Sequence, residues 1–98
     1  MTRQIEPGLT RRLLAQGPRL MLVEHCMAEG WHGTRHSHPH EQLVFVLSGR
    51  IRVSCGEQPP FEATSGDSFV VAGDVSHQVS ALTESRVLDV FTPVREDY

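Results

Sequence analysis

Turn-forming residues divide this chain into short segments, and their spacing constrains the fold more than any other feature. Runs rich in β-branched, aromatic and other apolar residues occupy positions 19–27, 41–47, 51–55, 68–71, 77–81 and 86–92. Glycine, proline, serine and aspartate separate these runs, at positions 30–33, 48–49, 56–60, 65–67 and 73–74 among others. Segments of about five residues with a turn roughly every ten are typical of an antiparallel sandwich or barrel. We therefore expect an all-β domain.

Local signals within this pattern add three expectations. Residues 41–47 and 51–55, joined by Ser48-Gly49, have the form of a β-hairpin. The one helical signal is a turn or two over residues 10–16, ended by Gly17-Pro18. A length of 98 residues suits one domain over residues 1–98, with residues 1–18 as an N-terminal arm that could add to a partner subunit.

Charge and hydropathy exclude several classes of partner. The formal net charge is −3 and the arginines are scattered, which argues against nucleic-acid binding. No apolar run approaches the roughly 18 residues that a membrane span requires, and the charged, proline-containing N-terminus is unlike a secretory signal. Cys26 and Cys55 lack the spacing of a metal motif and are interpreted as small buried hydrophobic residues. These features predict a cytoplasmic protein.

The histidines are the residues most suggestive of chemistry. Four of the six lie within nine consecutive residues, 32–40. In an extended chain His36 and His38 point to the same side, and Gln42 keeps that parity at the start of the next strand. His77 is the only histidine downstream and would complete an enclosed site from another strand. The sequence therefore predicts one divalent metal ion held by His36, His38, Gln42 and His77.

This ligand set narrows the identity of the metal and the charge of the molecule that it would bind. Three imidazoles and an amide suit nickel, iron(II), manganese, cobalt or zinc, and the pattern does not choose among them. Because all four ligands are neutral, the charge of the ion stays uncancelled and favours an anionic ligand.

The neighbouring residues receive less specific interpretations. His25 and His32 are interpreted as surface residues or as core histidines with satisfied hydrogen bonds. His40 has the parity of the ligands but follows Pro39, and we expect it at the mouth of the site. Glu41 has the opposite parity and should turn away from the metal unless a bulge redirects it.

Two stretches resemble the motifs of the cupin family. Residues 30–49, GWHGTRHSHPHEQLVFVLSG, are similar to the first cupin motif, and residues 66–77, GDSFVVAGDVSH, to the second. The chain departs from the usual pattern in having Ala72 where proline is common, Asp74 where glycine is frequent, and Gln42 in place of the commoner glutamate. The resemblance implies a single-domain cupin fold, the jelly-roll barrel also called a double-stranded β-helix.

A narrower resemblance extends over nearly the whole chain from about Gly8. The segments HSHPHEQ, LVFVLSGRIRV, GDSFVVAGDVSH and LDVFTPVREDY are similar to a small cupin of pectin and alginate breakdown that linearises 4,5-unsaturated uronates. It implies a homodimer that converts a cyclic 4-deoxy-4,5-unsaturated uronate to the linear keto-acid. It also implies catalytic roles for Asp89, Phe91 and Arg95.

The chemistry of these three residues agrees with such roles. Asp89 and Phe91 lie two apart on the last expected strand, so both face one side, which we take as the metal side. A carboxylate there would act as acid or base, the phenyl ring as an apolar wall, and the planar fork of Arg95 would suit a uronate carboxylate.

Two other classes of function remain open: a non-catalytic module that binds metal or a sugar acid, and a metal-dependent dioxygenase. An inward-pointing Asp89 would favour uronate chemistry, and an outward-pointing one the binding module.

Overall fold

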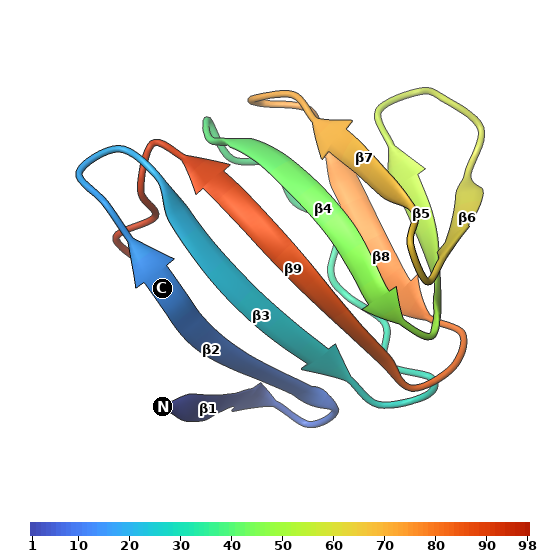
Figure 1. The fold of residues 1–98 in the computed structure, drawn as a ribbon. Coiled ribbons are helices and arrows are strands. Elements are labelled where there is room, and N and C mark those ends of the chain that lie inside the picture. The colour runs from blue at the N-terminus through green and yellow to red at the C-terminus, as the bar shows by residue number, and fades with distance from the viewer.

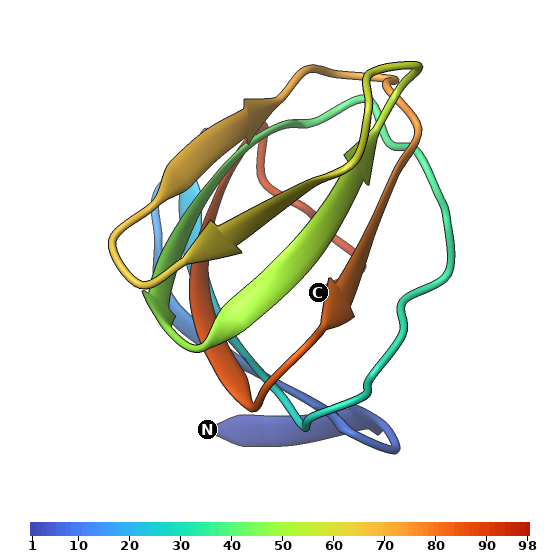
Figure 2. The same cartoon turned by 90° about the vertical axis from the view of Figure 1, so that its right-hand side faces the viewer.

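The computed structural model describes residues 1–98 as nine strands in two antiparallel sheets, without a helix (Figure 1). The larger sheet has the order β1 (Thr2–Glu6), β2 (Leu9–Gln16), β3 (Met21–Met27), β9 (Ser85–Thr92), β4 (Glu41–Ser48) and β7 (Ser68–Val71). The smaller sheet has the order β6 (Phe61–Thr64), β5 (Arg50–Cys55) and β8 (His77–Ala81). The two sheets face each other across the interior (Figure 2). This confirms the expected all-β jelly-roll barrel.

The core lies between the sheets because apolar residues alternate with polar ones along the strands. Val44 and Val46 point inward from β4, and Ile51 and Val53 point inward from β5 to meet them. Burying such side chains contributes roughly 1.5–3 kcal/mol each. A second, smaller apolar cluster, formed by Met21, Val23 and Phe91, lies apart from the first.

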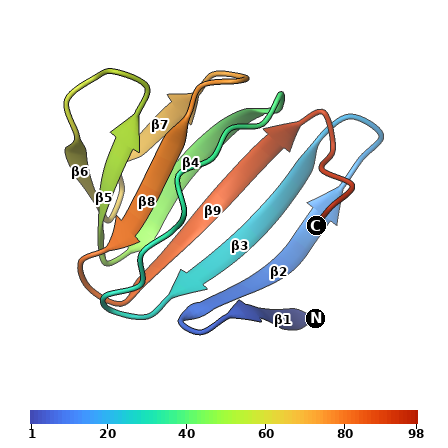
Figure 3. The same cartoon turned by 180° about the vertical axis from the view of Figure 1, so that it is seen from behind.

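The long connection between β3 and β4 brings the expected ligand stretch to the smaller sheet. Figure 3 shows this segment running alongside β8 before it enters β4. Isolated bridges pair His32 with Ser80 and His36 with His77. The connection is therefore fixed to β8 of the smaller sheet before the chain enters β4 of the larger one, and it brings the two histidine-bearing stretches together.

The hairpin expected at Ser48-Gly49 is not formed. β4 pairs with β7 and β9, whereas β5 pairs with β6 and β8, so the chain crosses from one sheet to the other at this turn. Gly49 has φ 88°, and a Cβ there would lie 2.3 Å from the Glu84 carbonyl oxygen. The turn signal was correctly located, but interior packing rather than local turn chemistry decided which strands pair.

The helical turn expected over residues 10–16 is also wrong, because this segment belongs to β2. Its residues pair with β3 from Leu9 opposite Met27 to Gln16 opposite Met21. Hydrogen bonding along a neighbouring strand has overridden a weak local helix preference. Residues 1–16 thus form β1 and β2 at one edge of the larger sheet, and their role as an arm towards a partner remains a prediction. The structure contains no helix that could span a membrane.

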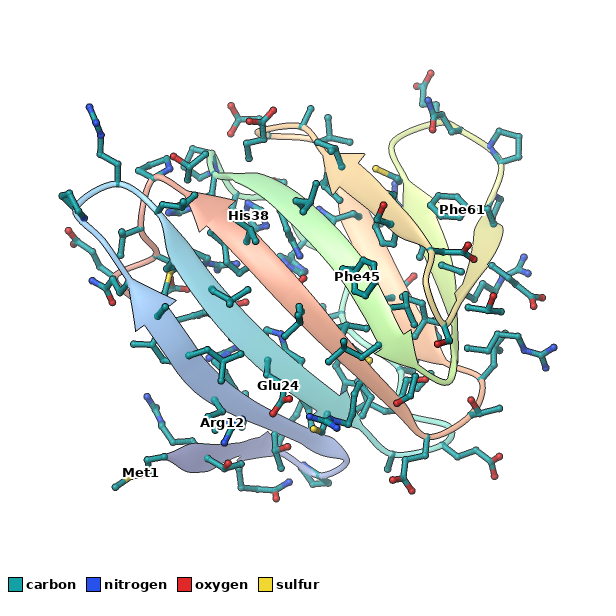
Figure 4. The ribbon with its side chains drawn as sticks, viewed as in Figure 1. Met1, Arg12, Glu24, His38, Phe45 and Phe61 are labelled. Atoms are coloured by element: carbon teal, nitrogen blue, oxygen red, sulfur yellow. The ribbon has the colours of Figure 1, made fainter.

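The outer face of the larger sheet carries exposed apolar side chains. Leu43, Phe45 and Leu47 point outward from β4, and Val70 joins them from β7. Phe45 is seen on this face in Figure 4, which also shows Arg12 and Glu24 further along the sheet.

Candidate metal centre

Three histidines meet at one end of the barrel, next to the ends of β4 and β9 (Figure 4, His38). One ligand nitrogen from each of His36, His38 and His77 lies within 4.8 Å of the other two. Reciprocal backbone hydrogen bonds between His36 and His77, of 3.0 and 2.8 Å, hold two of these residues side by side. His38 and His77 are buried, whereas His36 is exposed and would form the open side of the cluster.

The turn before His77 is fixed to the His38 stretch. Asp74 has φ 65°, a left-handed conformation that explains why glycine is frequent at this position. Its backbone N–H donates to the His38 carbonyl at 2.7 Å. A Cβ on Gly73 would lie 2.5 Å from the Pro39 carbonyl oxygen, so the two segments touch through their backbones.

Each imidazole is oriented by a backbone carbonyl. The Nδ1–H groups of His36, His38 and His77 donate to the carbonyl oxygens of Thr34, His40 and Val75, at 3.0, 3.0 and 2.9 Å. The Nε2 atoms are then left as lone pairs, which is the tautomer a metal ligand requires. Burial lowers the pKa of His38 and of His77 below the ordinary 6.5, and nearby positive charge lowers both values further. Both rings therefore stay neutral.

Gln42 adds an oxygen to this nitrogen cluster. Its Oε1 lies 3.0 Å from Nε2 of His38, and its Nε2 donates to Oδ1 of Asp89 at 2.8 Å. Because the carboxylate accepts hydrogen bonds, the amide NH₂ faces Asp89 and the amide oxygen faces His38. A neutral His38 that donates from Nδ1 has no proton left on Nε2, so two acceptors face each other. A cation bound between them would satisfy both, and the donor set fits the expected metal.

Asp89 points into the interior and is 3 % exposed. Besides the bond from Gln42, its Oδ2 lies 2.7 Å from Nδ1 of His25, and Nε2 of His25 accepts from Nε of Arg11 at 3.0 Å. Hydrogen-bonded side chains thus run along the inner face of four adjacent strands, Arg11 on β2, His25 on β3, Asp89 on β9 and Gln42 on β4.

Phe91 packs against His38, and Arg95 lies next to Phe91. Phe91 is completely buried, and its ring centroid lies 5.8 Å from that of His38 and 5.3 Å from that of Tyr98, with edge-to-face geometry in both pairs. The guanidinium of Arg95 lies 5.2 Å from the Phe91 ring. Its Nε and Nη2 donate to the Asp97 carboxylate at 3.1 and 2.8 Å, and its Nη1 donates to the Tyr98 hydroxyl at 3.2 Å. The fork expected to bind a substrate carboxylate is therefore occupied by a carboxylate of the chain itself.

A cavity of about 320 Å³ opens beside these groups. Its polar lining includes His36, Gln42, His77, Asp89 and Arg95, while apolar side chains of both sheets form the rest of its wall. Such a volume is sufficient for a ligand of monosaccharide size. Neither His38 nor Phe91 lines the cavity, and Phe91 supports the metal cluster by packing against the His38 ring.

The remaining candidates lie outside the cluster. Glu41 is exposed, in keeping with its opposite parity, and His32 is exposed with its ring bonded to Ser80 and Gln78. His40 is half-buried with its ring 5.5 Å from that of His38, and its Nδ1 has no hydrogen-bond partner.

Three polar residues near Asp89 were not proposed from the sequence as site residues: His25, Arg11 and Tyr98. His25 is the core histidine with satisfied hydrogen bonds that was one of its two expected interpretations. A signal for His25 was present, because Met21, Val23, His25 and Met27 alternate as inward-facing positions of one strand. A histidine at one of the inward-facing positions of an otherwise apolar strand face requires a buried hydrogen-bond partner. Arg11 and Tyr98 left no comparable signal, since their contact, 3.4 Å from the guanidinium carbon to the ring centroid, joins opposite ends of the chain.

Comparisons with known proteins agree with this fold. The model of a cupin domain matches residues 23–91. The pectin degradation protein KdgF of Dickeya dadantii is 31% identical over 97 residues, which covers 97% of this chain and 87% of that protein. The structure of KdgF from Halomonas sp. is 33% identical with a TM-score of 0.93, covering 99% of this chain and 89% of the other. An RmlC-like cupin from Shewanella frigidimarina has the same identity and TM-score, with 99% and 86% coverage.

Proposed function

This chain belongs to the cupin family, and on that premise we propose that it converts cyclic 4-deoxy-4,5-unsaturated uronates from pectin or alginate breakdown to their linear keto-acid form. The similarity to two proteins named KdgF, one of them described as a pectin degradation protein, supports the substrate class. The observation that carries the proposal is the position of Asp89, which is buried, bonded to Gln42 beside the histidine cluster, and exposed to the cavity.

We assign His36, His38, Gln42 and His77 as ligands of one divalent ion. The three oriented imidazoles and the amide oxygen support this assignment, and nickel, iron(II), manganese, cobalt and zinc all suit such a set. When bound, the ion would supply Lewis acidity and attraction for an anionic sugar.

The proposed reaction moves one proton within the substrate. The ring is a hemiacetal at C1 and an enol ether across C4 and C5, and opening it breaks the bond between C1 and the ring oxygen. The C1 hydroxyl loses a proton and C4 gains one, which leaves an aldehyde at C1 and a ketone at C5. Asp89 accepts the first proton and returns it, because each of its oxygens keeps a lone pair free of the bonds from Gln42 and His25.

Arg95 and Phe91 have supporting roles in this scheme. The uronate carboxylate replaces that of Asp97 on the Arg95 fork, an exchange of one bidentate partner for another. Phe91 packs edge-to-face against the imidazole of His38 and provides an apolar support for that ring.

We further propose that the protein works as a homodimer in the cytoplasm. The exposed apolar face formed by Leu43, Phe45, Leu47 and Val70 is the surface that a second copy would cover. Cys26 and Cys55 are both unpaired, which suits a reducing compartment.

Incubation of the purified protein with an unsaturated uronate monomer, with and without chelator, tests the proposal. We expect the ultraviolet absorbance of the conjugated double bond to fall, and chelator to stop this loss. Asp89→Asn should keep its metal, measured by elemental analysis, and lose turnover. Bound metal without turnover in the unmodified protein would instead favour the binding module, and uptake of oxygen would favour dioxygenase chemistry.

A further inference from the structure

We propose that His25 is a positioning residue that fixes the carboxylate of Asp89 for proton transfer, with Arg11 fixing the tautomer of His25. The inference deepens the proposed function and rests on it, because Asp89 is the acid and base of that reaction.

The carboxylate of Asp89 is held from both of the strands that flank β9. Gln42 on β4 donates to Oδ1 at 2.8 Å, and His25 on β3 approaches Oδ2 at 2.7 Å. His25 is 6 % exposed, and the edge of its ring meets Tyr98 with 5.7 Å between the ring centroids. Rotation of the carboxylate would break both hydrogen bonds, so its remaining lone pairs keep one direction relative to the cavity.

The tautomer of His25 follows from its second partner. A guanidinium has only donors, so Nε2 of His25 must accept the bond from Nε of Arg11, which is 3.0 Å long. The ring proton of neutral His25 is therefore on Nδ1, where it faces Asp89. The other tautomer would direct a lone pair at the carboxylate and a proton at the guanidinium.

Arg11 is itself held in place. Arg11 and His25 are directly opposite each other in the pairing of β2 with β3. The guanidinium carbon lies 3.4 Å from the centroid of the Tyr98 ring, a stacked cation–π contact. The Arg11–His25 pair is thus built into neighbouring strands rather than into a mobile loop.

Substitution of His25 by asparagine and by glutamine separates positioning from simple packing. An asparagine amide N–H can occupy the place of the Nδ1–H, whereas glutamine places its amide nearer the position of Nε2. Loss of a hydrogen bond that orients a reacting group typically costs 10–100-fold. We expect His25→Gln to lower kcat about 10–100-fold with KM little changed, His25→Asn to recover most of that loss, and both to retain metal.

The matched control is His32→Gln, which changes an exposed histidine on the connection that leads to the cluster. It should leave kcat and KM unchanged. Equal kcat in His25→Gln and the unmodified protein, or an equal loss of kcat in His25→Asn and His25→Gln, would overturn the positioning role.

A second measurement needs neither substrate nor a variant of His25. In ¹⁵N nuclear magnetic resonance spectra of the protein loaded with diamagnetic zinc, His25 should show a protonated Nδ1 and an unprotonated Nε2. Arg11→Met should shift this pattern towards a mixture of tautomers. A protonated Nε2 in the unmodified protein would refute the inference even if the uronate is turned over. Absence of turnover with the expected tautomer would refute the proposed function, and with it the role in proton transfer, while the hydrogen-bonded arrangement of Arg11, His25 and Asp89 would stand.

Discussion

Replacing Gln42 by glutamate tests the arrangement around Asp89 with almost no change of shape. The amide nitrogen of Gln42 donates to Asp89 at 2.8 Å, and glutamate would put a second carboxylate oxygen in that place. The structure thereby explains why glutamine stands at a position where other cupins commonly have glutamate: the amide is the donor that the neighbouring carboxylate needs.

The size of the effect follows from two contributions. Losing a hydrogen bond to a charged group costs about 1.5–3 kcal/mol. Two carboxylates with charge centres about 4 Å apart repel by roughly 4 kcal/mol at an effective dielectric constant of about 20. A bound cation offsets part of this repulsion, and the remainder is relieved when the pair shares a proton or Asp89 swings away. Both responses remove an ionised, oriented Asp89, and we expect kcat/KM to fall by at least about 100-fold, equivalent to about 2.7 kcal/mol.

The assay is loss of ultraviolet absorbance of the unsaturated uronate, accompanied by elemental analysis. Metal content should be maintained or raised, because glutamate is an anionic ligand, and this would separate the loss of activity from loss of the ion. Gln58→Glu, in an exposed turn, makes the same change of charge and should be neutral. The double variant with Gln42→Glu and Asp89→Asn reverses the hydrogen bond, because the amide at position 89 would donate to the carboxylate at position 42. It should therefore regain the thermal stability that Gln42→Glu loses, but it should stay inactive. Wild-type kcat/KM in Gln42→Glu would refute the reasoning.

Three further perturbations have defined outcomes. His77→Ala should abolish metal retention after dialysis, measured by elemental analysis, whereas His32→Ala at an exposed histidine should retain it; undiminished metal in the first variant would remove the assigned site. Gly49→Ala should lower the free energy of unfolding in urea by about 2 kcal/mol or more, because the added Cβ would lie 2.3 Å from a backbone carbonyl oxygen. Gly66→Ala, also at positive φ but with open space around it, should lose only about 1 kcal/mol, and equal losses would contradict the clash. Burial raises the pKa of Tyr98 above the ordinary 10.0. Just above pH 10, therefore, the phenol keeps its proton in the folded protein and releases it in the unfolded chain. Stability should therefore fall as the pH rises above about 10, and Tyr98→Phe should reduce this dependence in urea titrations.

The sequence predicted the strands well where alternation and turn residues agree. The expected runs 68–71 and 77–81 coincide with β7 and β8, because glycine-containing turns limit both at their N-terminal ends. It failed at Gly49, where the local turn signal is the same for a hairpin and for a crossing between sheets. Only contacts distant in sequence, such as that between Gly49 and Glu84, distinguish these two outcomes.

The grouping of the candidate metal ligands could be predicted from the sequence, whereas the hydrogen-bond partners of Asp89 could not. Parity within one stretch was enough to bring His36, His38 and Gln42 to one side, and the isolation of His77 suggested its participation. The pairing of His25 with Asp89 joins residues 64 positions apart in the sequence, and no local pattern specifies which inward-facing residue of a neighbouring strand will be in reach.

The carbonyl groups that orient the three imidazoles belong to the main chain, and every amino acid carries one. The side chains of Thr34, His40 and Val75 can therefore be exchanged during evolution without changing the orientation of the three imidazole rings, provided that the backbone path is kept. A search for related proteins should accordingly give little weight to identities at these three positions and more to the turns that shape the backbone around them.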